Sequence, residues 1–213
     1  MDAIIFDVDG TLWDSTNVVA VSYNRILEKY ADLSVHVTAD DLKRLFGKPM
    51  DVIFNELLPG LPYEEQCRIG SECFDQEHEE LEKTPGTLYD GIEETLRVLS
   101  AKCPLFIVSN CQAGYIELFL RKTGFGCYIK DHLCFGQTGT SKGQTILRLV
   151  RENNLHSPVY VGDTQGDADA CKEAGIPFVF AEYGFGHAEN PDYRIHTFRD
   201  LQTLYDELSR TFR

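Results

Sequence analysis

The 213-residue sequence lacks several features that would place it in a specialised class of protein. It contains no run of about 20 apolar residues, the length needed to cross a membrane. The apolar run Ala3–Phe6 is too short for a signal peptide and leads directly into an acidic motif. The seven cysteines show no C-x-x-C or zinc-type spacing, which favours reduced, mostly buried thiols. We therefore expect a cytoplasmic protein with no membrane partner.

Positive charge is also scarce. The chain has 20 Lys and Arg against 34 Asp and Glu, a formal net charge of −14. Nucleic acids and anionic membranes are polyanions, so this charge balance disfavours both as partners. An anionic substrate would need a local feature that overcomes the overall negative field, and a bound metal ion is one such feature.

Strand signals are missing from the stretch 15–83. The spacing of its apolar residues predicts helices at about 17–30, 38–46, 49–57 and 63–82. Thr38-x-x-Asp41 matches a capping box at the start of the second helix. The face of the last helix that we expect to be buried consists of Cys67, Gly70, Phe74, His78 and Leu81. The stretch is expected to form a small all-helical unit.

Strands and helices alternate in the rest of the chain. Buried strands are predicted at 3–6, 104–108 and 158–161, and further strands at 133–135 and 178–180. Helices are predicted from Asp90, as the N-cap, through Leu99, and at about 113–122, 142–150, 168–174 and 201–208. This alternation predicts a parallel sheet with right-handed crossovers. The expected fold is α/β, with a Rossmann-like core of residues 1–14 and 84–213, helices on both faces of its sheet, and the helical unit 15–83 inserted after the first strand.

The first strand ends in two carboxylates, Asp7 and Asp9, followed by Gly10 and Thr11. An unbroken apolar run before them is typical of a strand that is buried on both faces. Alternate residues of an extended chain point to the same side, so Asp7 and Asp9 are expected to face one site. The alternative is an ordinary Asp-Gly turn after an edge strand.

Polar side chains also follow the other buried strands. Ser109 and Asn110 follow the strand 104–108, while Asp163 and Asp167 follow the strand 158–161. Lys142 opens the helix that precedes the second of these strands. Each feature alone is also typical of a polar strand end or a solvated lysine. Because the carboxyl ends of parallel strands share one edge, their joint occurrence in this order predicts a common site.

Four carboxylates in one pocket repel one another unless a cation lies among them. Their hard oxygen ligands suit Mg²⁺, which binds through a few carboxylates and substrate phosphate. The metal and Lys142 would neutralise a phosphoryl group, and Ser109 with backbone N–H groups would hold its oxygens. Two carboxylates then remain available as nucleophile and proton donor.

The four motifs together resemble the haloacid dehalogenase-like (HAD) hydrolase superfamily. They are Asp7-x-Asp9-Gly10-Thr11, Val108-Ser109-Asn110, Lys142 and Gly162-Asp163-x-x-x-Asp167. The resemblance implies that Asp7 attacks phosphorus to give an aspartyl-phosphate, and that Asp9 protonates the leaving group and then activates water. It implies Mg²⁺ ligation by the Asp7 carboxylate, the Asp9 carbonyl and Asp163, supported by Asp167. The phosphate-binding and substrate-binding positions it implies are Thr11, Ser109, Asn110 and Lys142.

The helical insert resembles the C1-type cap of that superfamily, and residues 88–92 and 169–177 resemble its phosphoglycolate phosphatase-like branch. Gly47-Lys48-Pro49 is similar to the loop by which such caps reach the active site, which makes Lys48 a candidate substrate-binding residue. A charge at a helix end is the alternative for Lys48. Dehalogenases lack the carboxylate of Asp9, and phosphomutases usually have serine in place of Asn110. This chain therefore differs from both groups of enzymes, and both differences favour a phosphatase.

The leading expectation is a Mg²⁺-dependent phosphatase that acts on a small phosphorylated metabolite, as a monomer or homodimer. The alternatives are a sugar phosphomutase or pyrophosphatase of the same superfamily, or a phosphate-binding regulatory module without turnover. Asp9 distinguishes the last alternative, because a protein that only binds phosphate needs no acid or base there.

Overall fold

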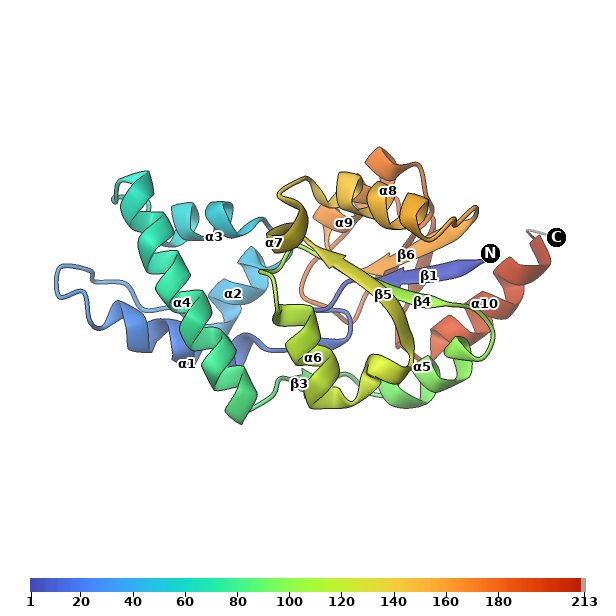
Figure 1. The fold of residues 1–213 in the computed structure, drawn as a ribbon, viewed down its shortest axis with the longest axis horizontal. Coiled ribbons are helices and arrows are strands. Elements are labelled where there is room, and N and C mark those ends of the chain that lie inside the picture. Colours follow the sequence, from blue (N-terminus) through green and yellow to red (C-terminus); the bar gives the residue numbers. More distant parts are fainter. Residues whose placement is uncertain (212–213) are drawn as a thin grey trace.

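The structure is a computed structural model that describes residues 1–211. A six-stranded sheet forms the centre of one half of the molecule, and four helices form the other half (Figure 1). The strand order is β5-β4-β1-β6-β7-β8, and every neighbouring pair is parallel. The strands are β1 (Ala3–Phe6), β4 (Leu105–Ser109), β5 (Ile129–Cys134), β6 (Pro158–Gly162), β7 (Phe178–Ala181) and β8 (Tyr193–Ile195). The predicted α/β fold with a parallel sheet is confirmed.

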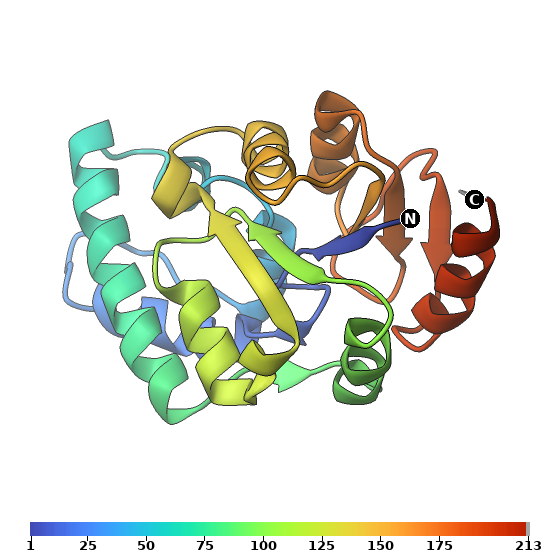
Figure 2. The ribbon, with the colours of Figure 1, turned by 45° about the vertical axis from the view of Figure 1, so that its right-hand side comes forward.

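Both faces of this sheet are covered by helices, as the burial of β1 requires. Ala3 and Ile5 pack toward α8 (Lys142–Glu152) and α9 (Gln165–Ala174) on one face. Ile4 and Phe6 belong to the core on the opposite face, which also contains α5 (Ile92–Ser100), α6 (Tyr115–Thr123) and α10 (Asp200–Thr211). Figures 1 and 2 show α8 and α9 on the side of the sheet opposite to α5 and α6. A single turn of 3₁₀-helix, Phe125–Cys127, and the short α7 (Phe135–Thr138) flank β5.

The stretch 15–83 contains four helices and no strand, as expected. They are α1 (Thr16–Leu27), α2 (Ala39–Leu45), α3 (Met50–Leu57) and α4 (Tyr63–Lys83). Thr38 and Asp41 form the predicted capping box at the start of α2. Tyr23, Phe54 and Phe74 pack with ring centroids 5.3–6.3 Å apart and join α1, α3 and α4.

The buried face of α4 differs from the prediction. Its buried residues are Gln66, Ile69, Gly70, Cys73, Glu77 and Leu81, whereas Cys67 is exposed. Two polar residues are buried because they have partners: the Gln66 amide donates to the carbonyl oxygens of Leu58 and Leu61, and Glu77 accepts from Gln112. Apolar spacing alone cannot find a face that is partly made of satisfied polar side chains.

A two-stranded antiparallel ribbon, missed by the sequence analysis, connects the two halves of the molecule. Its strands β2 (Trp13–Asp14) and β3 (Thr87–Leu88) lie next to each other, so the two connections between sheet and helices run side by side. Two residues per strand are too few to produce an alternating pattern. A Cβ atom on Gly86 would lie 2.9 Å from the Trp13 indole, which explains the glycine before β3.

Asp90 was predicted to cap α5, but this is wrong. The N-cap is Gly91, with φ of 77°, and no side chain caps the helix. Asp90 instead forms an ion pair with Arg199 at 3.4 Å. The strand β8 was also missed, and β5 begins four residues earlier than predicted.

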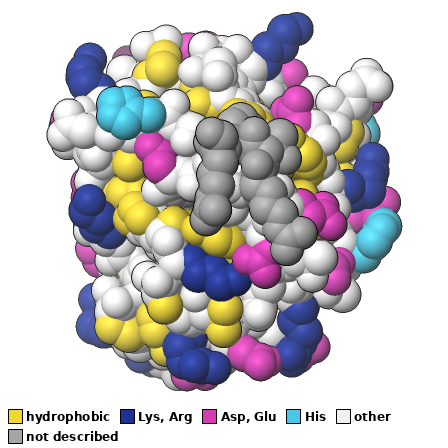
Figure 3. Space-filling view, turned by 90° about the vertical axis from the view of Figure 1, so that its right-hand side faces the viewer, with side chains coloured by type: hydrophobic (Ala, Val, Ile, Leu, Met, Phe, Trp, Pro, Cys, Tyr) yellow, Lys and Arg dark blue, Asp and Glu magenta, His cyan; other side chains and the backbone are white. Residues whose placement is uncertain are grey.

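Within residues 1–211, no helix is both long enough and apolar enough to cross a bilayer. The described part of the face in Figure 3 carries lysine, arginine and acidic side chains interspersed with one another. The excess of negative charge is therefore not gathered into a single patch on that face.

Candidate active site

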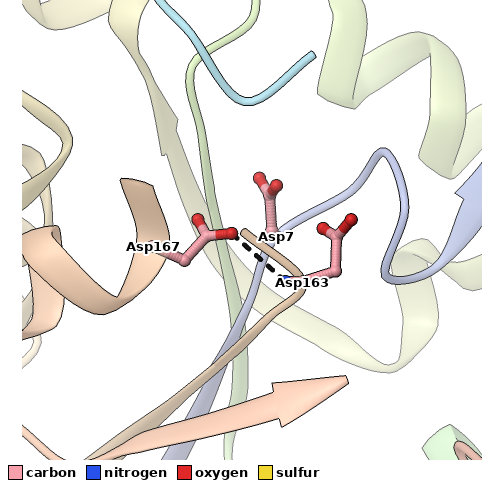
Figure 4. A group of neighbouring side chains, drawn as sticks. All are labelled: Asp7, Asp163 and Asp167. Atoms are coloured by element: carbon pink, nitrogen blue, oxygen red, sulfur yellow. Dashed lines mark hydrogen bonds between the residues drawn. The ribbon is translucent and has the colours of Figure 1, made fainter. Parts of the chain in front are cut away.

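Three carboxylates from distant parts of the sequence meet at the carboxyl edge of the sheet. Asp7 follows β1, Asp163 follows β6, and Asp167 lies in the first turn of α9 (Figure 4). One oxygen from each lies within 4.8 Å of the others, and all three residues are buried. The convergence predicted from the strand ends is therefore observed for these three acids.

Lys142 reaches the same place from the start of α8. Its Nζ atom lies 2.6 Å from Asp167 Oδ1 and 3.2 Å from Asp7 Oδ1, and its side chain is 4% exposed. Burial alone would lower the pKa of this ammonium group, but the Asp167 and Asp7 carboxylates raise it above its usual value. A permanent positive charge thus faces the position in front of Asp7.

The three clustered carboxylates together carry more negative charge than the single Lys142 ammonium group can neutralise. Burial raises the pKa of Asp7 to about 6, opposed by Lys142 and reinforced by Asp167. Burial, together with Asp167 and Asp7, also raises the pKa of Asp163 well above its ordinary value. Asp7 Oδ1 is buried and accepts no hydrogen bond of good geometry, despite the nearby ammonium group. Three clustered carboxylates, one with an oxygen that accepts no hydrogen bond, are a donor set that fits a divalent cation.

Hydrogen bonds hold Asp163 in place. Thr11 Oγ1 donates to its Oδ1 at 3.2 Å, and the Phe185 backbone N–H donates to its Oδ2 at 2.8 Å. A Cβ atom on Gly10, where φ is 81°, would lie 2.1 Å from Asp163 Oδ2. Gly10 was expected to allow the turn and Thr11 to bind substrate. In the structure both serve Asp163, since Gly10 leaves room for its carboxylate and Thr11 donates a hydrogen bond to it.

Asp167 is positioned by the start of its own helix. Its Oδ2 accepts from the backbone N–H and hydroxyl of Thr164 and from the backbone N–H of Asp163, which is a capping box with an extra donor. Tyr160 donates to its Oδ1 at 3.3 Å. A Cβ atom on Gly162 would lie 2.6 Å from Asp167 Cγ, so this position requires glycine.

Asp9 stands apart from the other three carboxylates. A single oxygen, Oδ1, accepts from Ser15 Oγ at 2.6 Å, Tyr115 OH at 2.8 Å and Trp13 Nε1 at 3.1 Å. Burial nevertheless raises the pKa of Asp9 to about 7, since the Ser15, Tyr115 and Trp13 hydrogen bonds offset only part of the penalty and nearby Asp7 adds to it. The expected cluster of four acids is therefore a cluster of three with a separate, pre-oriented fourth.

The three donors to Asp9 were not identified from the sequence. Trp13 and Ser15 follow the first motif closely, so their proximity to Asp9 was a usable signal. Tyr115 lies 106 residues away on α6, and only the tertiary fold brings it to Asp9.

A cavity of about 40 Å³ opens in front of Asp7 and Asp9, between the sheet and the helical insert. From the sheet side it is lined by Ser109, Asn110, Cys111, Gln112 and Tyr115, and from the insert by Tyr23, Phe46, Gly47, Lys48, Met50, Ile53, Phe74 and Glu77. Ser109 is close enough to Asp7 to lower the pKa of that carboxyl by a hydrogen bond. The side chain of Asn110 donates to the carbonyl oxygen of Gly47 at 2.8 Å and thereby joins the two halves of the molecule.

Lys48 lines this cavity, as predicted, but its ammonium group is turned to another partner. Nζ lies 2.8 Å from both oxygens of Glu56, and the side chain is 39% exposed. Its contribution to substrate binding stays a prediction.

Glu77 is a buried carboxylate in the cavity wall that the sequence analysis did not single out. It is 3% exposed and accepts from Gln112 Nε2 at 3.0 Å, again across the two halves of the molecule. Burial raises its pKa from 4.5 to about 7, while hydrogen bonds from Gln112 and Tyr23 oppose this shift. No apolar pattern marks such a residue in a long acidic helix.

The raised pKa of Glu77 predicts a pH-dependent effect of Glu77→Gln on stability. A carboxyl with a higher pKa in the folded chain binds its proton more tightly there, so the native state loses stability as the pH rises from about 4.5 to about 7. Glutamine does not titrate. Relative to the parent, Glu77→Gln is therefore expected to gain up to about 3 kcal/mol in free energy of unfolding between pH 5 and pH 8.

Urea unfolding of both proteins at these two pH values measures this difference. Glu79→Gln is the matched control, because Glu79 lies on the same helix and is exposed. An equal effect of Glu77→Gln at both pH values would contradict the prediction.

Comparison with known proteins adds an independent result. Residues 4–181 match the family model described as haloacid dehalogenase-like hydrolase. The phosphoglycolate phosphatase of Escherichia coli (strain K12) is 27% identical over 229 residues, covering 93% of this chain and 90% of that protein. The helical insert is included in the matched region.

Solved structures agree on the fold. A structure described as a predicted phosphoglycolate phosphatase from Haemophilus somnus superposes with a TM-score of 0.84 at 22% identity, covering 96% of this chain and 98% of that one. A haloacid dehalogenase-like family hydrolase from Streptococcus pneumoniae gives a TM-score of 0.83 at 21% identity, with coverage of 96% and 98%. At these identities the likeness concerns the fold alone.

Proposed function

The chain belongs to the haloacid dehalogenase-like hydrolase family, and we propose that it is a Mg²⁺-dependent phosphatase that hydrolyses a small phosphorylated metabolite through an aspartyl-phosphate on Asp7. One observation carries this proposal. Asp7 follows a buried strand and faces a cavity, and one of its oxygens accepts no hydrogen bond of good geometry. A buried lysine and two further carboxylates lie around it.

Asp7 is the proposed nucleophile. Its carboxylate would attack phosphorus, the bond to the ester oxygen would break, and the phosphoryl group would be carried on Asp7 until water releases it. Lys142, beside Asp7 Oδ1, would pair with the phosphoryl oxygens, and the Ser109 hydroxyl would donate to them. Thr11 would contribute by holding Asp163, and Asn110 by forming the cavity wall.

Asp9 is the proposed general acid and base. Its three hydrogen bonds hold one carboxylate oxygen, and its pKa of about 7 suits a group that first gives a proton to the departing alkoxide and then takes one from water. Tyr115, Ser15 and Trp13 are the proposed positioning residues, because they contact Asp9 and fix its orientation.

Asp7, Asp163 and Asp167 are the residues that would hold the Mg²⁺ ion, together with the backbone carbonyl of Asp9. When bound, the ion would neutralise charge on the phosphoryl oxygens. The remaining contributions come from the chain, since Thr11 and the Phe185 backbone N–H hold Asp163.

Phosphate release from a panel of small esters, with and without Mg²⁺, tests the proposal. EDTA is expected to remove activity and Mg²⁺ to restore it. Asp163→Asn should raise the Mg²⁺ concentration needed for half-maximal rate by about tenfold or more, because one anionic ligand of the set is lost. The control Asp169→Asn changes an exposed aspartate of α9 and should leave this concentration unchanged. Full activity in excess EDTA would refute metal dependence.

Residues 15–83 would form a cap domain that covers the cavity, while residues 1–14 and 84–213 form the core domain. The ribbon of β2 and β3 would be the hinge, because both connections run through it. The contacts of Asn110 with Gly47 and of Gln112 with Glu77 would hold the closed form. Closure excludes stray water during transfer to Asp7, and opening exchanges product for substrate. In the closed form Lys48 would contact the part of the substrate beyond the phosphate.

A further inference from the structure

The cavity wall opposite Asp7 and Asp9 is mostly apolar, and among the residues that the structure describes it carries two charged side chains, Lys48 and Glu77. The positive one is already neutralised, since Lys48 is bound to both oxygens of Glu56 and its side chain is 39% exposed. The negative one is buried, and Glu77 makes no ion pair with a basic residue in the part of the chain whose side chains are described. Glu77 therefore dominates the recognition chemistry on this side.

The hydrogen-bonding capacity of Glu77 is not exhausted. Its carboxylate offers about four acceptor positions, and the structure provides donors from Gln112 Nε2 at 3.0 Å and from the Tyr23 hydroxyl. Glu77 and both donors line the cavity, so a molecule bound there meets the Glu77 side chain. A buried acceptor is best matched by a ligand that donates a hydrogen bond.

A carboxylate of the substrate would be unfavourable beside Glu77. It would lie in a small, largely apolar cavity together with Glu77 and Asp9, without an unpaired cation in the described cavity wall. Ionised Glu77 repels such a carboxylate. Beside protonated Glu77 the incoming charge is still removed from water without a cation as partner. Substrates whose leaving group ends in a carboxylate, such as the phosphoglycolate named for the E. coli relative, are poorly matched to this wall.

We infer, on the basis of the proposed phosphatase function, that Glu77 is a specificity-determining residue that selects short, uncharged, hydroxyl-bearing leaving groups, so that the substrate class is the phosphate monoesters of small polyols. The leaving-group hydroxyl donates to the Glu77 carboxyl. The cavity lies between the sheet and the helical insert, so a short leaving group bound to the phosphoryl group in front of Asp7 meets the wall that contains Glu77.

The protonation of Glu77 favours a hydroxyl over an ammonium group. Burial raises the pKa of Glu77 to about 7, so the carboxyl is partly neutral near neutral pH. A neutral carboxyl still accepts a hydrogen bond from a hydroxyl, but it loses most of its attraction for a cation.

The experiment compares kcat/KM for glycerol 3-phosphate, 2-phosphoglycolate and ethanolamine phosphate in the parent, Glu77→Gln and Glu79→Gln. The parent is expected to prefer glycerol 3-phosphate over 2-phosphoglycolate by tenfold or more. Glu77→Gln should reduce this ratio at least tenfold, because the amide removes the negative charge. Glu79→Gln, on the exposed side of the same helix, should leave it unchanged. Both rates are measured on one preparation, so the ratio does not depend on the fraction of folded protein.

Acetyl phosphate, whose leaving group is too short to depend on a distant contact, reports the proposed phosphatase function separately. If none of the four compounds is hydrolysed in the presence of Mg²⁺, the proposed function itself fails. If acetyl phosphate is hydrolysed, three results each overturn the inference: a preference for 2-phosphoglycolate, a preference for ethanolamine phosphate, or an unchanged ratio in Glu77→Gln.

Discussion

Asp7→Asn is expected to abolish phosphate release, with a loss of about 10⁴-fold or more, the scale on which removal of a catalytic nucleophile acts. The amide keeps the shape of the side chain but cannot attack phosphorus. Initial rates of phosphate release from an ester hydrolysed by the parent measure the loss.

The fold should survive this change, because asparagine fits the same space at the end of β1. Circular dichroism and the thermal midpoint are the checks, and Asp169→Asn on the surface of α9 is the matched control for an Asp-to-Asn change. After rapid acid quenching, the parent should yield a phosphorylated peptide that contains Asp7, and the variant should not. Activity within tenfold of the parent would rule out Asp7 as the nucleophile.

Lys142→Met is expected to have the largest effect on stability. The ammonium group is buried between Asp7 and Asp167, at 3.2 and 2.6 Å, and methionine would leave both carboxylates without their cation. Removing one partner of a buried ion pair costs about 3–5 kcal/mol in free energy of unfolding. Turnover should be lost as well, because the ammonium group beside Asp7 that would pair with the phosphoryl oxygens is gone. Urea unfolding at pH 7 measures the first effect and phosphate release the second.

A second substitution separates charge imbalance from loss of packing. In Lys142→Met/Asp167→Asn one of the two uncompensated carboxylates is gone, so part of the lost stability should return. Lys102→Met is the surface control, since its ion pair with Asp206 is largely solvated and should contribute less than about 1 kcal/mol. A loss in Lys142→Met no greater than that in Lys102→Met would contradict this account of the site.

The parallel sheet and the meeting of Asp7, Asp163 and Lys142 could be predicted from the sequence. Each acid directly follows an unbroken apolar run, and the carboxyl ends of parallel strands can only lie on one edge. Lys142 starts the helix before β6, so it begins near the same edge. These predictions depend on local sequence patterns and on one rule of topology, which can be applied once the order of strands and helices is known.

The surroundings of Asp9 and the wall of the cavity were decided by the tertiary structure. Tyr115 donates to Asp9 across 106 residues, and Glu77 is accommodated in the cavity wall because Gln112 and Tyr23 donate to it. The ribbon of β2 and β3 pairs segments that have no strand pattern of their own. A buried polar group is stable only when its partners are present, and those partners come from distant elements. Apolar periodicity records which side chains avoid water, but it carries no information on which polar side chains find one another.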